Sequence, residues 1–169
     1  MTISEIANLI IALSTAGSWL YISRQVNVAR LQAKGQFLLA LDSQFEKYAD
    51  LTIRLLTEQH FDPQGKDWPE IFGLMSVFER INIMVDDKIL DIGLVDRLYG
   101  FRLIGILANE GIYQRLLATG AEWQDFIDLC YEIAKHRGQG IADATTNAFI
   151  ERVQTLNKDA LTVANPFQF

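Results

Sequence analysis

An uncharged stretch of 18 residues lies near the start of the chain, IANLIIALSTAGSWLYIS at positions 6–23. As an α-helix it would be about 27 Å long, close to the roughly 30 Å thickness of the hydrocarbon layer of a bilayer. Trp19 and Tyr21 lie toward its C-terminal end, where aromatic rings favour the level of the lipid headgroups. The stretch therefore predicts a membrane anchor over residues 1–23.

The charges after this stretch predict its orientation. Residues 24–34 contain Arg24, Arg30 and Lys34 and no acidic residue, whereas residues 35–169 have a net charge of −8. Basic residues beside a membrane helix favour the cytoplasmic side. We therefore expect a single-pass protein of the bacterial inner membrane, with the N-terminus outside and the C-terminal domain in the cytoplasm. A cleaved secretory signal does not fit, because its bases would precede the apolar run.

The same stretch has a second interpretation. Polar side chains within it weaken its insertion into lipid, namely Asn8, Ser14, Thr15, Ser18 and Ser23. A charge-free run of this length also occurs in the buried helices of soluble bundles. The alternative is therefore an N-terminal helix that the later helices surround, and in that case the predicted location and orientation both fail.

Composition excludes several classes of function. The chain has 169 residues, one cysteine (Cys130) and two histidines (His60 and His136), which are too few for a disulfide framework, a zinc finger or an iron–sulfur site. Its net charge is −6 and its isoelectric point is about 4.9, so it lacks the positive charge on which nonspecific nucleic-acid binding depends. We predict no metal, no cofactor and no nucleic-acid partner.

After the anchor, the spacing of apolar residues predicts an all-α fold. Residues 24–60 contain no proline and have heptad-like apolar spacing, which predicts a long helix next to the membrane. The spaced residues are Leu31, Leu38, Leu41, Phe45, Tyr48 and Leu55. Gly35 does not end such a helix. The apolar side of the helix packs either within the same bundle or, as an alternative, against another copy of the chain in a coiled coil.

A loop rich in proline and glycine, residues 61–70, precedes the predicted helical bundle over residues 69–160, which packs on 24–60. Pro69 suits the first turn of a helix that ends near Val85, and Asp91 is placed to cap the next helix. That next helix carries Leu94, Leu98, Phe101, Ile104 and Leu107. Residues 161–169 form a loose tail, and no segment alternates with the period of a strand.

The clearest amphipathic helix spans residues 121–137. Its apolar stripe comprises Trp123, Phe126, Ile127, Cys130, Ile133 and Ala134. Acidic residues come early in it and basic residues late, as the helix dipole favours. Earlier in the chain, Asn109 to Gly111 indicates a break between helices. Gly138 and Gly140 indicate the end of the helix over 121–137, and a weaker helix follows them.

No familiar catalytic spacing is present, so candidate chemistry rests on scattered residues. Cys130 lies on an apolar stripe, which predicts an inert core thiol, and His136 lies at a helix end, where it complements exposed carbonyl groups. His60 has no distinguishing neighbour. Four acidic residues fall within eleven positions without the spacing of a calcium loop, and they indicate a solvated turn with capping residues: Asp86, Asp87, Asp91 and Asp96.

Arg102 interrupts an apolar helix face, where an unpaired guanidinium group is costly. Glu79 is its expected partner, in a structural ion pair rather than a site that binds a ligand.

In the anchor, Ala12 and Ala16, and likewise Ser14 and Ser18, have the small-residue spacing that allows membrane helices to approach closely.

Two segments resemble a class of bacterial proteins of unknown function that have one N-terminal membrane helix and a cytoplasmic all-helical domain. These segments are SRQVNVARLQAK after the anchor and WPEIFGLMSVFERINIMVDDKILDIGLVDRLYGF at 68–101. The resemblance covers about half of the chain and implies a fold but no activity. We therefore expect a membrane-anchored module for protein interaction or regulation, without enzymatic activity. The alternative is a homo-oligomeric membrane assembly that passes ions or small solutes.

Overall fold

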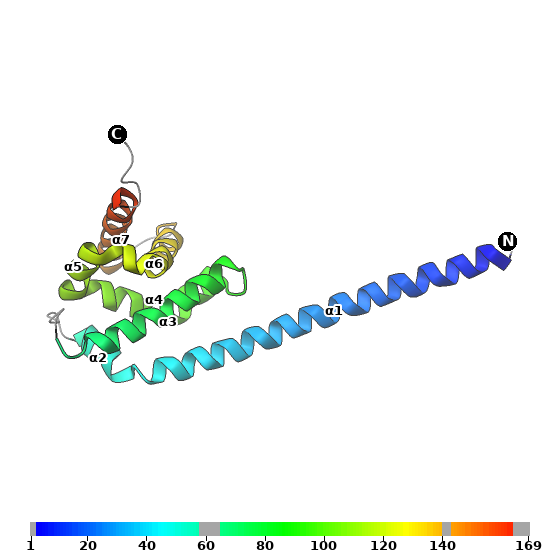
Figure 1. Ribbon diagram of the computed structural model, residues 1–169, viewed down its shortest axis with the longest axis horizontal. Helices are drawn as coiled ribbons and strands as arrows, with labels where there is room; N and C mark the ends of the chain where they lie inside the picture. Colours follow the sequence, from blue (N-terminus) through cyan, green and yellow to red (C-terminus); the bar gives the residue numbers. More distant parts are fainter. Residues whose placement is uncertain (1–2, 58–64, 140–142, 164–169) are drawn as a thin grey trace. The chain divides into compact units, whose positions relative to one another are not determined.

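The computed structural model describes residues 3–57, 65–139 and 143–163, and it is helical in these three ranges, with no strand. The predicted all-α fold class is confirmed (Figure 1). The elements are α1 (Ile3–Glu46), α2 (Ala49–Thr57), α3 (Trp68–Asp86), α4 (Ile92–Ala108), α5 (Glu110–Thr119), the 3₁₀ helix η1 (Gly120–Trp123), α6 (Gln124–Arg137) and α7 (Ala144–Val163). His60, most of the predicted loop and most of the predicted tail lie outside the described residues.

The chain divides into two compact units, residues 1–41 and residues 42–169. We call the first unit the N-terminal helix, because its described part consists of α1 alone, and the second unit the helical domain. The last turn of α1, from Asp42 to Glu46, belongs to the helical domain.

The N-terminal helix continues through Gly35 without a break, as its sequence predicts. Large apolar side chains are exposed along it, including Trp19 at 75%, Tyr21 at 65% and Leu31 at 70%. A helix in the core of a bundle would bury these side chains. Within the described part of the chain, no helix is both long enough and apolar enough to cross a membrane, so the structure does not support the predicted span over 6–23.

The predicted long helix over residues 24–60 is divided in two, because α1 ends at Glu46 and α2 begins at Ala49. No proline or glycine causes the break. The Tyr48 hydroxyl instead occupies the space that a side chain at position 73 of α3 would fill, where the chain has Gly73. Leu51 of α2, just after the turn between the two helices, is buried. The heptad-like seam is accordingly buried only in part: Leu41, Phe45 and Leu55 are buried, whereas Leu31 is exposed.

The core of the helical domain is built around α6, which packs against α3, α4 and α7 (Figure 1). The apolar stripe predicted for this helix is confirmed. Its buried members in α6 are Phe126, Ile127, Cys130, Ile133 and Ala134, and the buried Trp123 lies just before them in η1. The Phe78 ring of α3 lies between two further aromatic rings, 5.1 Å from the Phe45 centroid and 6.1 Å from the Phe126 centroid.

Several predicted helix ends are also confirmed. Pro69 lies in the first turn of α3. The Asp91 carboxylate accepts a hydrogen bond of 3.1 Å from the backbone N–H of Leu94 and thereby caps α4. At the predicted break, Asn109 separates α4 from α5, and its side-chain oxygen accepts from the backbone N–H of Ile112 at 3.4 Å.

Candidate functional site

Cys130 lies in the core, with no exposed surface. Burial raises the pKa of its thiol well above the ordinary value, because the thiolate would lose its hydration. The predicted place of Cys130 in the core is therefore confirmed.

His136 contacts a carboxylate of a neighbouring helix instead of serving only its own helix end. Its Nδ1 lies 3.2 Å from Oδ2 of Asp96 in α4, and the Nε–H of Arg137 donates to Oδ1 of the same carboxylate at 2.7 Å. The Asp96 side chain is only 11% exposed, so this ion pair joins α4 to α6 in a partly desolvated place. Its role is structural, because both oxygens of Asp96 are already occupied.

Gly100 makes room for this ion pair. A Cβ atom at this position would overlap Oδ1 of Asp96 and lie 2.8 Å from Nη2 of Arg137. We expect Gly100→Ala to lower the free energy of unfolding by about 1–2 kcal/mol, because the displaced ion pair outweighs the roughly 1 kcal/mol that alanine adds to helix propensity. Urea unfolding followed by circular dichroism measures this change.

Gly35→Ala is the matched control, because nothing lies within 4 Å of a Cβ atom at that position. The control should keep or raise helix content, because only the propensity term acts there. Equal stabilisation by the two substitutions would contradict the proposed role of Gly100.

The four acidic residues between positions 86 and 96 do not converge. Asp91 caps α4, Asp96 pairs with Arg137, and an Asp86 oxygen lies 3.4 Å from the Asn82 amide. No group of three or more metal-ligating side chains gathers anywhere among the described residues. The structure thus shows helix capping and ion pairing at these positions.

The predicted ion pair between Arg102 and Glu79 is wrong. The Arg102 guanidinium carbon lies 4.8 Å from the centre of the Phe45 ring and 4.7 Å from that of Phe101, so aromatic rings replace a carboxylate as its neighbours. Its Nε atom is buried without a hydrogen-bond partner in the part of the chain that the structure describes. Glu79 instead lies near Asp125, and burial, followed by the charge of Asp125, raises its pKa.

Asp42 is the acidic residue whose charge reaches Arg102, and the Tyr99 hydroxyl already donates to it at 2.9 Å. Desolvation lowers the pKa of the Arg102 guanidinium, while Tyr99 and Asp42 act in the opposite direction. Arginine side chains are effectively always protonated in proteins, so the group carries a positive charge at neutral pH. Its terminal nitrogens therefore present a positive charge beside an aromatic surface.

The side of α4 that contains Leu94, Leu98 and Phe101 faces solvent rather than the core. The buried side consists of Val95, Tyr99, Leu103, Ile106 and Leu107, of which only Leu107 belongs to the apolar set predicted for this helix. Because α4 is apolar on nearly every side, the spacing of its apolar residues could not show which side is buried. Leu98 is 39% exposed and Phe101 is 47% exposed.

This apolar surface extends onto α2. Leu56 lies over Gly105, and its Cδ2 atom is 2.6 Å from the position that a Cβ atom would have at residue 105. Leu56 is itself 52% exposed. Gly105 follows Phe101 by four positions and therefore continues the same side of α4. We define the α4 outer face as Leu94, Leu98, Phe101 and the covering Leu56. Arg97 and Arg102 lie on opposite sides of this stripe, as a rotation of 100° per residue requires.

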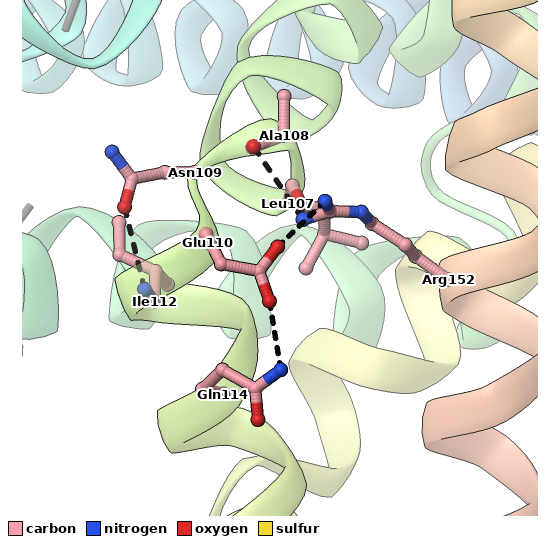
Figure 2. Close-up of polar contacts among 7 residues, drawn as sticks. All are labelled: Leu107, Ala108, Asn109, Glu110, Ile112, Gln114 and Arg152. Carbon is pink, nitrogen blue, oxygen red and sulfur yellow. Dashed lines mark hydrogen bonds and ion pairs between the residues drawn. The ribbon is translucent and has the colours of Figure 1, made fainter. Parts of the chain in front are cut away.

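The junction of α4 and α5 is held by a residue of α7 (Figure 2). The Arg152 guanidinium donates to the backbone oxygen of Leu107 at 2.6 Å and to that of Ala108 at 3.4 Å. It also pairs with Glu110 at 2.8 Å and lies over the Tyr113 ring. These bonds satisfy the last carbonyl groups of α4, which no capping glycine serves, so this arginine has a structural role.

Shallow hollows occur on both units of the described structure. One lies along the N-terminal helix, has a volume of about 470 Å³, and is lined by Trp19, Ile22, Ser23, Val26, Asn27 and Arg30. The other, of about 280 Å³, lies between α6 and α7 and is lined mainly by polar and small residues. The Lys135 ammonium group beside the second hollow pairs with Glu132, so this hollow offers no unpaired charge.

No protein family, curated protein or solved structure matches this chain. The resemblance to membrane-anchored bacterial proteins therefore stays a prediction, and the candidate site rests on its own geometry.

Proposed function

We propose that this protein is a protein-interaction module that the N-terminal helix attaches to a negatively charged membrane surface. The observation that carries the proposal is the exposure of apolar side chains on opposite sides of this helix. Trp19 and Val26 lie on one side, and Tyr21 and Val28 lie on the other. Apolar side chains that are exposed on two opposite sides of a helix favour an apolar surrounding, and lipid provides one.

The basic residues favour lipid over a second copy of the chain as this surrounding. Arg24, Arg30 and Lys34 occur without an acidic residue nearby in the sequence, so paired parallel helices would bring like charges together. Anionic headgroups attract such a segment, by roughly 1 kcal/mol for each basic residue near the surface. In the topology that we propose, residues 6–23 enter the bilayer of the bacterial inner membrane from the cytoplasmic side and the helical domain stays in the cytoplasm.

A vesicle experiment tests the proposal. We expect the full chain to sediment with vesicles that contain phosphatidylglycerol and to bind pure phosphatidylcholine vesicles more weakly. Replacing Arg24, Arg30 and Lys34 together by glutamine should weaken binding to the anionic vesicles about 100-fold, because three favourable charges are lost. The matched control replaces the exposed Lys47, Lys66 and Lys88 of the helical domain by glutamine and should leave binding unchanged.

An alkaline carbonate wash of membranes from expressing cells completes the test, with protein retained in the pellet as the expected result. Full release of the protein, or an equal effect of the two triple substitutions on vesicle binding, would overturn the proposal. Chemical crosslinking that traps stable oligomers through the N-terminal helix would favour the alternative, a homo-oligomeric assembly.

A further inference from the structure

We infer that the α4 outer face binds an acidic amphipathic helix of a partner protein. The inference rests on the proposed interaction role and names the chemistry of the partner. It does not depend on membrane attachment, because the face belongs to the helical domain alone.

The first argument is the shape and chemistry of the face. Its apolar side chains follow one side of α4 from Leu94 to Gly105, which is about 17 Å of helix. That length fits about three turns of a docked helix, which would present apolar residues at i, i+3, i+4 and i+7. Phe101 is the large aromatic residue of the face, and aromatic residues, phenylalanine included, are enriched at protein interfaces.

The second argument is charge. Arg97 and Arg102 lie on the two sides of the apolar stripe, and neither forms a hydrogen bond or an ion pair with the described residues. Elsewhere in the domain, Arg54, Arg137 and Arg152 pair with carboxylates, whereas Arg80 donates to the backbone oxygen of Ser76. Two arginines without carboxylate partners beside an exposed apolar stripe are complementary to glutamate or aspartate residues on both edges of a docked helix.

The third argument favours a protein helix over a bilayer as the occupant. Residues 42–169 have a net charge of −8, whereas residues 1–41 have a net charge of +2. An anionic membrane is a broad negative surface and would repel this domain. The carboxylates of a docked helix would lie within a few ångströms of the two arginines. Salt therefore screens their attraction to the arginines less than it screens the longer-range repulsion between the domain and other negative charges.

Binding of synthetic helical peptides to the full chain in non-ionic detergent tests the inference. Three fluorescent peptides share one leucine stripe and differ only in the residues beside it, which are glutamate, glutamine or lysine. We expect fluorescence anisotropy to give the tightest binding for the glutamate peptide and the weakest for the lysine peptide. Phe101→Ala should weaken binding of the glutamate peptide about tenfold, because it removes the central apolar contact.

Substitution of the arginines gives a second readout. Arg97→Gln and Arg102→Gln should each weaken binding of the glutamate peptide about threefold and leave binding of the glutamine peptide unchanged. Arg97 is exposed, so its substitution remains informative if Arg102→Gln disturbs the packing against Phe45. Arg80→Gln is the matched control, because Arg80 is an exposed arginine on α3, and it should change neither affinity.

Four results would overturn the inference. The first is no binding of the glutamate peptide up to about 1 mM, which is weaker than a specific helix docking would be. The second is equal affinity for the glutamate and lysine peptides. The third is a dimer of the chain that Phe101→Ala dissociates in sedimentation experiments, because the face would then hold a second copy. The fourth is loss of vesicle binding in Phe101→Ala, because the face would then hold lipid.

Failure of the peptide experiment and failure of membrane attachment are distinguishable. Peptide binding is measured without vesicles, and the triple substitution of Arg24, Arg30 and Lys34 lies outside the helical domain. Vesicle binding without peptide binding would reject only the inferred partner. Peptide binding without vesicle binding would reject only the proposed membrane attachment.

Discussion

Phe78→Ala should lower the free energy of unfolding of the helical domain by about 3–5 kcal/mol, because it removes a large aromatic side chain from a closed core. Phe78 has no exposed surface and lies against Phe45 and Phe126, which belong to two different helices. These neighbours cannot close the space without moving α1 or α6. The change is a large part of the roughly 5–15 kcal/mol that stabilises a typical domain.

Urea unfolding monitored by circular dichroism measures this loss. Phe101→Ala is the matched control, because its ring is about half exposed on the α4 outer face, and it should cost less than about 1 kcal/mol. Similar losses for the two substitutions would show that the Phe101 ring is as well packed as the Phe78 ring and would remove the basis for an exposed docking face.

Arg152→Met should lower the free energy of unfolding by about 2–3 kcal/mol. Methionine keeps much of the length and apolar stem of the side chain but donates no hydrogen bond. The backbone oxygen of Leu107, a buried residue, then loses a charged donor, and a hydrogen bond to a charged group contributes about 1.5–3 kcal/mol. Thermal unfolding followed by circular dichroism measures this loss for the whole helical domain.

Glu110→Gln separates the two functions of Arg152. It removes the charge of the ion pair and leaves the bonds from Arg152 to the carbonyl groups of Leu107 and Ala108 in place. Because this ion pair is partly exposed, the loss should stay below about 1 kcal/mol. A loss as large as that of Arg152→Met would mean that the ion pair, and not the capping of α4, holds the α4–α5 junction.

Local sequence signals were sufficient where one residue type decides the structure. Asp91 as a capping residue, Pro69 in a first helical turn and the apolar stripe of α6 each depend on neighbours within about one or two turns of the chain. The helix content and most helix ends could therefore be predicted. The burial of Cys130 follows from the same stripe.

Features that depend on distant residues could not be predicted in this way. The break after Glu46 depends on Tyr48 fitting over Gly73, which is 25 positions away, and no residue in the turn itself indicates it. The α4 outer face was hidden because α4 is apolar all round, so periodicity gives it no preferred side.

The surroundings of two arginines could not be predicted, for a related reason. Arg102 was expected to pair with a carboxylate, but rings from α1 and α4 form its surroundings. Arg152 lies 45 positions beyond the carbonyl group of Leu107 that it caps. The absence of a capping glycine after Ala108 was the only local signal that such a partner was needed.

The complete burial of Cys130 has a practical consequence. A thiol-reactive probe should modify this sulfur only when the core opens, so the natural chain needs no cysteine removed before a single new cysteine is introduced for labelling. A nitroxide or fluorescent label at an exposed position such as Trp19 or Leu98 would then report on that position alone.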